Sequence, residues 1–303
     1  MILIVTHTED YTVDYVANIL NKREIPFYRL NTNLLNEIDY RISFFKTLEV
    51  TLAAKPNFRS VWFRRIKLPI FSSLQFEVSK YISLDYESLL FNLLTLYDFK
   101  NVISDPYKIY KAENKLFQLK EATRIGFKIP KTLLTSSRDD LKEFIRSTSS
   151  IVKPLRNGQI VFNDTNHLIY TSQIAISDLS NEIQLTPAIY QEEITKQFEI
   201  RVTVVNNCVF AASVNSQDNE STKVDWRRTR LSFKPFILPK RIEDQCLQLV
   251  NNLGLAFGAI DLIYTPADEY YFLEINPNGQ WVWIETDTNL PISQALVNYL
   301  TNE

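Results

Sequence analysis

The chain has 303 residues, of which 45% are hydrophobic and 22% charged, a composition typical of a globular protein. Its net charge of −2 gives no bulk field that would favour nucleic acid or a membrane surface. Only five glycines are present, and the earliest is Gly126. This placement excludes the GxGxxG turn and the GxxxxGK[ST] phosphate loop after the first strand, so a nucleotide would have to be held by other groups.

The first 105 residues alternate between strand and helix patterns, which predicts an α/β domain. The opening residues lack a basic segment, and their apolar run ends at Thr6, so they predict a first strand instead of a signal peptide. We expect strands at 2–6, 26–30, 40–45, 48–52 and 61–65, and helices at 10–22 and 72–97. No run of 18 apolar residues is present, so we expect neither a transmembrane helix nor a membrane partner.

Residues 106–187 are expected to form a central α+β domain. One long helix over 107–125, ended by Gly126 as a C-cap, is followed by a strand at 131–134, a helix at 138–146 and a strand at 150–154. Residues 188–303 predict a third domain, α+β with an antiparallel sheet. Its expected strands are 188–194, 198–205, 209–214, 259–264 and 270–276, with a turn at Asn206-Asn207 and a helix over 241–253.

Two acidic residues of the third domain are predicted to face each other across a hairpin. A four-residue turn over 266–269 places Thr265 opposite Tyr270 and therefore Asp261 opposite Glu274, with Asn276 on the face of Glu274. The opposite face is expected to be core, with Ile260, Leu262 and Tyr264 against Tyr271, Leu273 and Ile275. Facing carboxylates repel unless a cation lies between them, and oxygen ligands suit Mg²⁺. The alternative is a solvent-facing acid beside a lysine, but the apolar flanks favour a metal site.

The strand over 198–205 carries Glu199, Arg201 and Thr203 on one face and apolar residues on the other. An arginine near a metal site can neutralise a transferring phosphoryl group, and a glutamate can accept hydrogen bonds from ribose. A surface ion pair worth under ~1 kcal/mol is the simpler alternative for these two residues taken alone. Lys115 and Lys153 are likewise either phosphate ligands or ordinary solvated lysines.

Taken in order, these residues resemble the ATP-grasp superfamily over residues 105–290. The matching motifs are Asn114-Lys115, Val152-Lys153-Pro154, Gln191-Glu192-Glu193-Ile194, Glu199-Ile200-Arg201, Asp261 and Glu274-Ile275-Asn276-Pro277. The likeness is greatest to the graspetide (microviridin-type) peptide ligases, relatives of the RimK-type ligases, because of Trp62–Arg65, Asp225-Trp226-Arg227 and the segment ending in Gln280-Trp281. It implies a three-domain ATP-grasp fold: a preATP-grasp α/β domain (1–105), a central lid domain (106–187) and a C-terminal domain (188–303).

The resemblance also implies roles for these residues, with ATP and two Mg²⁺ ions as cofactors. Nucleotide contacts would come from Lys115, Lys153, Gln191, Glu192, Glu193, Ile194 and Glu199. Metal ligands would be Asp261, Glu274 and Asn276, and Arg201 would stabilise the transferred phosphate. Substrate contacts would come from Asp225, Arg227 and Arg64. The family's glycine-rich phosphate loop is reduced here to the single Gly158 in residues 155–159.

The implied activity is cyclisation of a ribosomally made precursor peptide, with a leader and an acidic core, through side-chain esters or amides. Residues 223–241 hold seven basic residues and one acidic residue, which would attract an acidic peptide, although a solvated loop explains them too. No nucleic-acid motif is present, and the two cysteines, Cys208 and Cys246, suit a reducing cytoplasm. The alternatives are a RimK-like amino-acid ligase and a non-catalytic nucleotide-binding regulator. A homodimer is left open.

Overall fold

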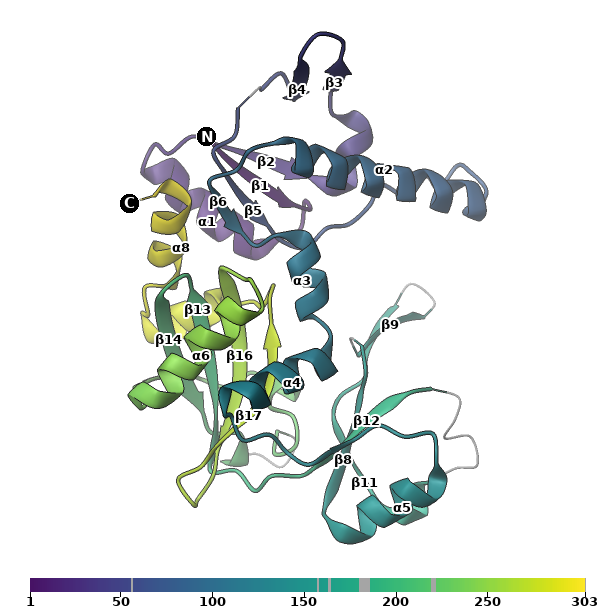
Figure 1. The fold of residues 1–303 in the computed structure, drawn as a ribbon, viewed down its shortest axis with the longest axis vertical. Coiled ribbons are helices and arrows are strands. Elements are labelled where there is room, and N and C mark those ends of the chain that lie inside the picture. Colours follow the sequence, from purple (N-terminus) through teal and green to yellow (C-terminus); the bar gives the residue numbers. More distant parts are fainter. Residues whose placement is uncertain (56, 157, 163–164, 180–185, 219–221, 303) are drawn as a thin grey trace.

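The computed structural model describes residues 1–55, 57–156, 158–162, 165–179, 186–218 and 222–302, without the side chains of 159–162, 165–166 and 227. Within these residues lie three larger sheets, of four, four and five strands, and two separate hairpins. Helices cover the sheets, so the chain has the mixed α/β architecture that the sequence predicts (Figure 1).

The first sheet is parallel and has the strand order β2-β1-β5-β6. Its strands are β1 (Ile2–Thr6), β2 (Phe27–Asn31), β5 (Ser60–Phe63) and β6 (Asn101–Ile103). One face packs against α1 (Tyr11–Lys22) and α8 (Ile292–Thr301), and the other against α2 (Phe76–Leu96). The sheet is therefore buried on both faces, as expected for parallel strands, and its central strand β1 is buried along its whole length.

The helix predicted over 107–125 is in fact two helices, α3 (Pro106–Ala112) and α4 (Lys115–Ile125). The prediction was wrong because Asn114 adopts an extended backbone conformation and caps α4, its side chain accepting a hydrogen bond from the Phe117 amide. Gly126 ends α4 with a φ of +92°, as predicted. The break matters for the site because it makes Lys115 the first residue of a new helix.

The second sheet is antiparallel, with the order β11-β8-β12-β7. Its strands are β7 (Thr132–Leu133), β8 (Ser150–Pro154), β11 (Ser172–Ile174) and β12 (Ala188–Glu192). The helix α5 (Arg138–Ser147) packs against it through Leu141, which contacts a small core that includes Tyr190. A hairpin of β9 (Gln159–Phe162) and β10 (Thr165–Leu168), not expected from the sequence, follows β8.

The third sheet is antiparallel, with the order β15-β14-β13-β16-β17. Its strands are β13 (Phe198–Val205), β14 (Cys208–Val214), β15 (Lys234–Phe236), β16 (Phe257–Tyr264) and β17 (Tyr270–Asn276). The helices α4 and α6 (Lys240–Asn252) cover one face, and apolar side chains of β13, β16 and β17 pack beneath them (Figure 1). Asn206, with a φ of +51°, makes the predicted turn between β13 and β14.

The register of the β16–β17 hairpin confirms one prediction and corrects another. Asp261 lies opposite Glu274, as expected. However, Tyr264 pairs with Tyr270, and a β-bulge between the pairs Leu262–Phe272 and Asp261–Glu274 leaves Leu273 without a partner residue. The turn is thus one residue longer than predicted, and the bulge offsets it. Phe272, fully buried, takes the core position that was assigned to Leu273, which lines the cleft described below.

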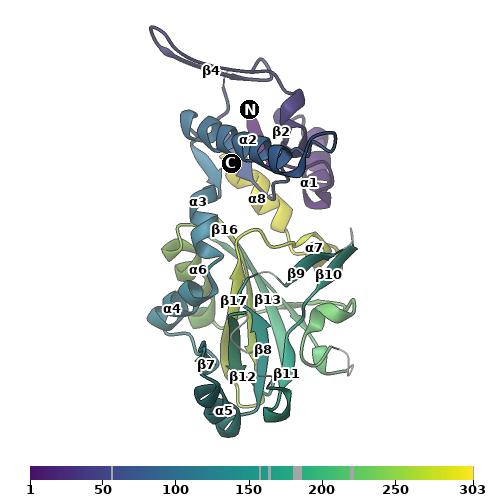
Figure 2. The same cartoon turned by 90° about the vertical axis from the view of Figure 1, so that its right-hand side faces the viewer.

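Two helices near the end of the sequence were not predicted, α7 (Val282–Thr288) and α8. The helix α8 lies between the first and third sheets, in contact with β5, β6 and β13. Figure 2 shows α8 beneath the first sheet and above the third. These contacts join the two parts of the molecule that contribute to the site.

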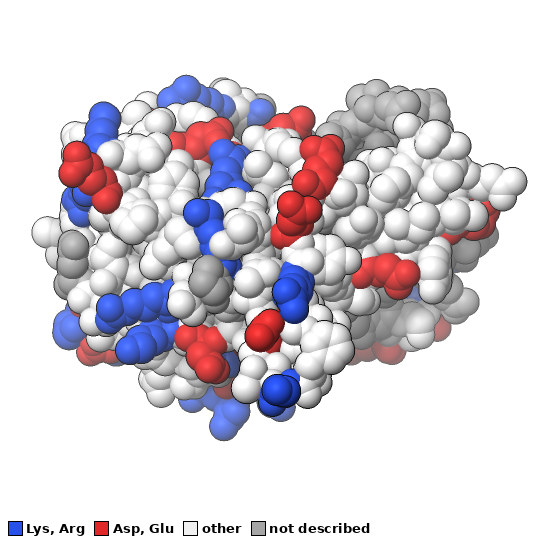
Figure 3. Space-filling model, turned by 90° about the horizontal axis from the view of Figure 1, so that it is seen from above, with Lys and Arg blue, Asp and Glu red and all other residues white. Residues whose placement is uncertain are grey.

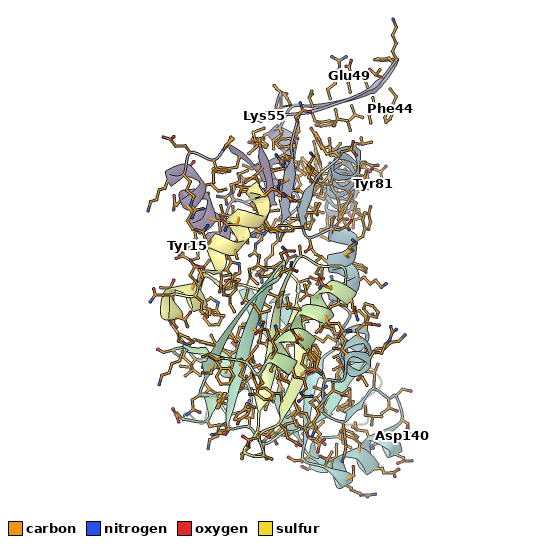
Figure 4. The ribbon with its side chains drawn as sticks, turned by 60° about the vertical axis from the view of Figure 1, so that its left-hand side comes forward. Tyr15, Phe44, Glu49, Lys55, Tyr81 and Asp140 are labelled. Atoms are coloured by element: carbon orange, nitrogen blue, oxygen red, sulfur yellow. The ribbon has the colours of Figure 1, made fainter. Side chains whose placement is uncertain are left out.

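The hairpin of β3 (Tyr40–Phe44) and β4 (Leu48–Leu52) projects from the first sheet (Figures 2 and 4). Figure 4 shows the side chains of Phe44 and Glu49 beyond the body of the molecule. Phe44 and Phe45 near the hairpin tip are 71% and 90% exposed. On α2, the side chains of Phe76 and Tyr81 are also exposed, so apolar surface is concentrated in this region.

Positive and negative side chains are intermingled on the face shown in Figure 3. Neither sign forms a continuous field there, in keeping with the net charge of −2. Among the described residues, no helix combines the length and apolar character that a membrane span requires.

Candidate active site

A cleft of about 780 Å³ lies between the second and third sheets and the loop that follows β5. It collects most of the residues that the sequence singled out, although they come from seven separate segments of the chain. Those that line it are Arg64, Lys115, Lys153, Gln191, Glu192, Glu193, Ile194, Glu199, Asp225, Asp261, Glu274 and Asn276. Arg201 lies directly behind Asp261 and is 8% exposed.

Arg201 and Asp261 form an ion pair at the base of this cleft. They are opposite each other on β13 and β16, and Nη1 of Arg201 donates to both carboxylate oxygens of Asp261 at 2.8 Å. Gly279 packs against the guanidinium, since a Cβ on this glycine would lie 2.9 Å from Nη2 of Arg201 and 2.4 Å from the Cβ of Ala259. Only glycine fits this position without displacing the arginine.

Lys115 forms an ion pair with Glu274 inside the cleft. Its Nζ lies 3.6 Å from Oε2 of Glu274 and donates to the carbonyl oxygen of Pro154 at 3.2 Å. Lys115 begins α4, Glu274 is on β17 and Pro154 ends β8. One ammonium group therefore connects the second sheet to the third.

The donor set predicted for a metal consists of two carboxylates and one amide. Asp261 and Glu274 are paired across β16 and β17, and Asn276 follows two residues later on the same strand. Oδ1 of Asn276 accepts a hydrogen bond from the Asn278 amide at 2.9 Å, which fixes the orientation of the side chain. No cluster of three or more His, Cys, Asp or Glu occurs in the described ranges. The oxygen-only set fits Mg²⁺, which keeps waters and takes its other ligands from phosphates.

Glu199 is buried at the side of the cleft with two partners. Nζ of Lys196 and the hydroxyl of Ser216 both donate to its Oε1, the latter at 2.9 Å. Burial raises the pKa of the Glu199 carboxyl above its ordinary value, against the opposite effects of Lys196 and Ser216. Sequence reasoning missed Lys196; its only signal was a lysine three residues before a strand glutamate, which is not specific.

The segment from Gln191 to Ile194 ends β12 and forms one wall of the cleft. Gln191 is fully buried; its Nε2 donates to Oγ1 of Thr132 at 2.8 Å, and its Oε1 has no hydrogen-bond partner among the described residues. Glu193 accepts hydrogen bonds from Ser149 and Gln173. Lys153 is on the adjacent strand β8, opposite Ile189.

The segment predicted to bind substrate lies at another edge of the cleft. Asp225 is 5% exposed and lines the cleft just before a short 3-10 helix, Trp226–Arg228. Trp226 contacts Phe233 and Trp283 in an aromatic cluster. The side chain of Arg227 lies outside the described residues.

Arg64 follows β5 and is 1% exposed. Its Nε donates to Oδ2 of Asp10 at 3.3 Å, and Nη1 donates to the Asn278 carbonyl oxygen at 3.1 Å. Burial alone would raise the pKa of Asp10, but the charge of Arg64 and hydrogen bonds from Thr6, Arg64 and the Val13 amide outweigh it, so the pKa lies below its ordinary value. Sequence reasoning missed Asp10 and Asn278, because both are recognisable only through contacts distant in sequence.

The single-glycine loop after β8 also borders the cleft through Arg156 and Gly158; Asn157 is outside the described residues. The Gly158 carbonyl accepts a hydrogen bond from the Ile169 amide, and a Cβ on Gly158 would lie 2.2 Å from the Ile169 oxygen. The glycine therefore permits a close approach between the two ends of the β9–β10 hairpin.

Residues 112–300, more than half of the chain, match the RimK-like ATP-grasp domain. A solved structure similar over its whole length is the RiPP-associated ATP-grasp ligase of Chryseobacterium gregarium, in complex with ADP and a leader and core peptide. It has a TM-score of 0.90 and 28% identity, with 99% of this chain and 96% of that chain covered.

Macrocyclase MdnB from Microcystis aeruginosa MRC is similar at 30% identity, with a TM-score of 0.80 and 100% and 99% of the two chains covered. The alpha-aminoadipate–LysW ligase LysX of Sulfolobus acidocaldarius is 23% identical over 211 residues, which is 66% of this chain and 74% of the relative. All three matched proteins are ligases or macrocyclases, and the two solved structures have the fold described above.

Proposed function

Because this chain belongs to the RimK-like ATP-grasp family and is an ATP-dependent ligase, we propose that it closes rings in a ribosomally made precursor peptide. The observation that carries this proposal is the cleft in which a paired Arg201–Asp261, a Lys115–Glu274 contact and the Asp225 segment meet. The similarity to a ligase bound to ADP and to leader and core peptides supports it.

ATP is proposed to bind between the second and third sheets. Lys115 and Lys153 would contact phosphates, Gln191, Glu192, Glu193 and Ile194 would line the adenine pocket, and Glu199 would hold the ribose. Their common location in one cleft supports these roles. Since Glu199 already accepts from Lys196 and Ser216 through Oε1, its other oxygen is the one proposed to accept from ribose.

Asp261, Glu274 and Asn276 are proposed to hold two Mg²⁺ ions, together with the phosphates of ATP. The metal would neutralise phosphate charge and polarise the γ-phosphoryl group. Arg201 is proposed as the catalytic residue that stabilises the transferred phosphoryl group. Its bond to Asp261 supports this role, because a guanidinium fixed on both oxygens of a carboxylate requires little reorganisation.

The peptide substrate is proposed to place an acidic side chain of its core beside Asp225 and Arg227; Arg64, the third residue implied by the resemblance, lines the same cleft. The burial of Asp225 at the edge of the cleft and the basic residues of segment 223–241 support this placement. A remote leader would bind elsewhere on the protein and raise the local concentration of the core.

The reaction is proposed to run in two steps. A carboxylate oxygen of the peptide attacks the γ-phosphorus of ATP, which breaks the bond to the leaving oxygen of ADP and gives an acylphosphate. A Ser or Thr hydroxyl, or a Lys amine, of the same peptide then attacks the carbonyl carbon. Phosphate leaves, the nucleophile loses its proton to solvent, and an ester or amide remains. Holding both groups in one cleft makes the second step effectively intramolecular.

The experiment is incubation with a precursor peptide, ATP and Mg²⁺, followed by mass spectrometry of the peptide and measurement of released phosphate. Ring closure removes one water per linkage, whereas ligation of an amino acid adds mass. Glu274→Ala is expected to abolish linkage with the fold retained. Near-native linkage in this variant would contradict the metal site.

A RimK-like amino-acid ligase is the second candidate, and the likeness to LysX favours it. A gain in peptide mass would establish this alternative. A third candidate, a non-catalytic nucleotide-binding regulator, predicts nucleotide binding without peptide-stimulated phosphate release. The intact set of Arg201, Asp261, Glu274 and Asn276 argues against it.

The remaining proposals concern the protein as a whole. We propose a cytoplasmic enzyme with neither a nucleic-acid nor a membrane partner, divided into domains at residues 1–105, 106–187 and 188–303. A homodimer is proposed through the apolar surface of the β3–β4 hairpin and α2, because a projecting hairpin with exposed Phe44 and Phe45 is marginal alone in water. Light scattering would report twice 35.4 kDa, and Phe45→Glu should restore the monomer mass.

A further inference from the structure

Arg64 and Asn278 hold each other in place across 214 residues of sequence. Nη1 of Arg64 donates to the Asn278 carbonyl oxygen at 3.1 Å, and Nδ2 of Asn278 donates to the Arg64 carbonyl oxygen at 3.4 Å. The Arg64 amide in turn donates to the Val5 carbonyl oxygen at 2.9 Å. The end of the first sheet is thus connected by hydrogen bonds to the loop that follows β17.

The guanidinium of Arg64 is fixed from a second direction by Asp10. This carboxylate caps α1, accepting from the amides of Thr12 and Val13, and also accepts from Oγ1 of Thr6 at 2.9 Å. An arginine that is 1% exposed and bound on two sides has little freedom to follow a mobile substrate. Its planar fork reaches a carboxylate through Nε and a carbonyl through Nη1 in one fixed geometry, which the single nitrogen of a lysine does not reproduce.

The loop held by Arg64 carries groups of the proposed metal and phosphate site. The Asn278 amide donates to Oδ1 of Asn276 at 2.9 Å, and the Gly279 amide donates to the Asn276 carbonyl oxygen at 3.2 Å. Gly279 packs on the guanidinium of Arg201. A displacement of Asn278 would therefore move both the Asn276 side chain and the surface that supports Arg201.

We infer that Arg64 is a positioning residue, which with Asn278 sets the loop 276–279 and thereby the Asn276 oxygen and Arg201, instead of a residue that binds the peptide. This inference rests on the proposed role of Asn276 as a metal ligand. It revises the substrate contact assigned to Arg64 from the sequence. Outer residues that orient metal ligands affect metal affinity by about 10–100-fold when they are changed.

The test compares Arg64→Lys and Asn278→Ala with the wild type by calorimetric titration of ADP, once with Mn²⁺ and once with EDTA. Both variants should bind ADP with Mn²⁺ about tenfold more weakly, with the affinity for ADP in EDTA unchanged. Arg59→Lys is the matched control, because Arg59 is an exposed arginine that immediately precedes β5. It should behave as the wild type does.

The double variant Arg64→Lys/Asn278→Ala should lose no more metal-dependent affinity than either single variant, since the two residues act as one unit. Unchanged Mn²⁺-dependent binding in Asn278→Ala would overturn the inference, and this variant decides the question if Arg64→Lys does not fold. Normal metal-dependent binding with a raised peptide KM in Arg64→Lys would also overturn it, in favour of a substrate contact. If the wild type gains no ADP affinity from Mn²⁺, the proposed metal site fails instead.

Discussion

The two faces of the five-stranded sheet are built from the same strands, but one face buries apolar side chains and the other holds paired charges. On the helix-covered face, Ile200, Leu262 and Phe272 are almost fully buried and need only close packing. On the cleft face, the side chains of Arg201 and Asp261 are 9% and 16% exposed, and each charge is tolerated because the other neutralises it. One face of the sheet therefore sets stability and the other carries the chemistry, although residues next to each other in the sequence supply both.

The largest expected effect is that of Arg201→Ala on the cleft face. We expect kcat for peptide-dependent ATP turnover to fall by about 10²–10³-fold, because a preorganised cation is lost. The free energy of unfolding should also fall, by about 3 kcal/mol, since the partly buried Asp261 loses the guanidinium that neutralises it. Steady-state kinetics and urea unfolding measure the two effects.

The double variant Arg201→Ala/Asp261→Ala is the control for this first prediction. It should recover much of the stability, because no uncompensated charge remains, and none of the activity. A folded Arg201→Ala variant with near-native kcat would show that the cleft face does not carry the chemistry.

The second change affects the opposite face, one residue from Asp261. Leu262→Ala should lower the free energy of unfolding by about 2–5 kcal/mol, because a fully buried side chain is removed from the core. Below the unfolding temperature, kcat should stay within about twofold of the wild-type value, because the mutation leaves the cleft groups in place. A large drop in kcat without a drop in stability would contradict the assignment of stability to one face and chemistry to the other.

A smaller effect is expected for Asp225→Asn at the edge of the cleft. Loss of a charged hydrogen-bonding group should raise the KM for the peptide about tenfold, while the KM for ATP is unchanged. Competition kinetics with both substrates separates the two constants. Equal losses for peptide and ATP would assign Asp225 to the structure of the cleft instead of to substrate binding.

The smallest effect concerns Glu199, the buried acid of the cleft face. Because its folded pKa is raised, its protonated form favours the folded state, and this contribution is lost as the pH rises from its ordinary value of 4.5 through the folded pKa. The stability of Glu199→Gln relative to the wild type should therefore increase with pH over this window and then level off. Urea unfolding at a series of pH values measures the difference; a decrease with pH would contradict the raised pKa.

Sequence patterns predicted which residues share the cleft face, but they did not predict every detail of the strand pairing. Alternation along β13 was sufficient to place Glu199 and Arg201 together, because strand side chains alternate by geometry alone. The pairing of Asp261 with Glu274 was also predicted, but through two errors that cancel, a turn one residue too short and a missing bulge. The position of Leu273 in the cleft was not predicted, because the sequence pattern of an apolar residue at a bulge is the same as that of a core residue.

Other features depend on contacts that no local pattern contains. The Arg64–Asn278 hydrogen bonds join residues from opposite parts of the chain, so the sequence shows an arginine near a strand end and nothing of its partner. The helix break before Lys115, in contrast, could have been predicted from the local sequence. Asn114 is a common helix cap, and giving it more weight than the apolar periodicity would have divided the helix correctly.

The position of α8 has a consequence for how the protein is made. Ile292, Leu296 and Leu300 complete the apolar layer over Ile4 and Trp62 of the first sheet, and the hydroxyl of Ser60 donates to the Leu300 carbonyl oxygen at 2.6 Å. During synthesis, the part of that face that α1 does not cover therefore stays exposed until residues 292–301 have left the ribosome. The strands made first therefore complete their packing only when a helix made much later joins them, and apolar surface exposed in the meantime favours aggregation.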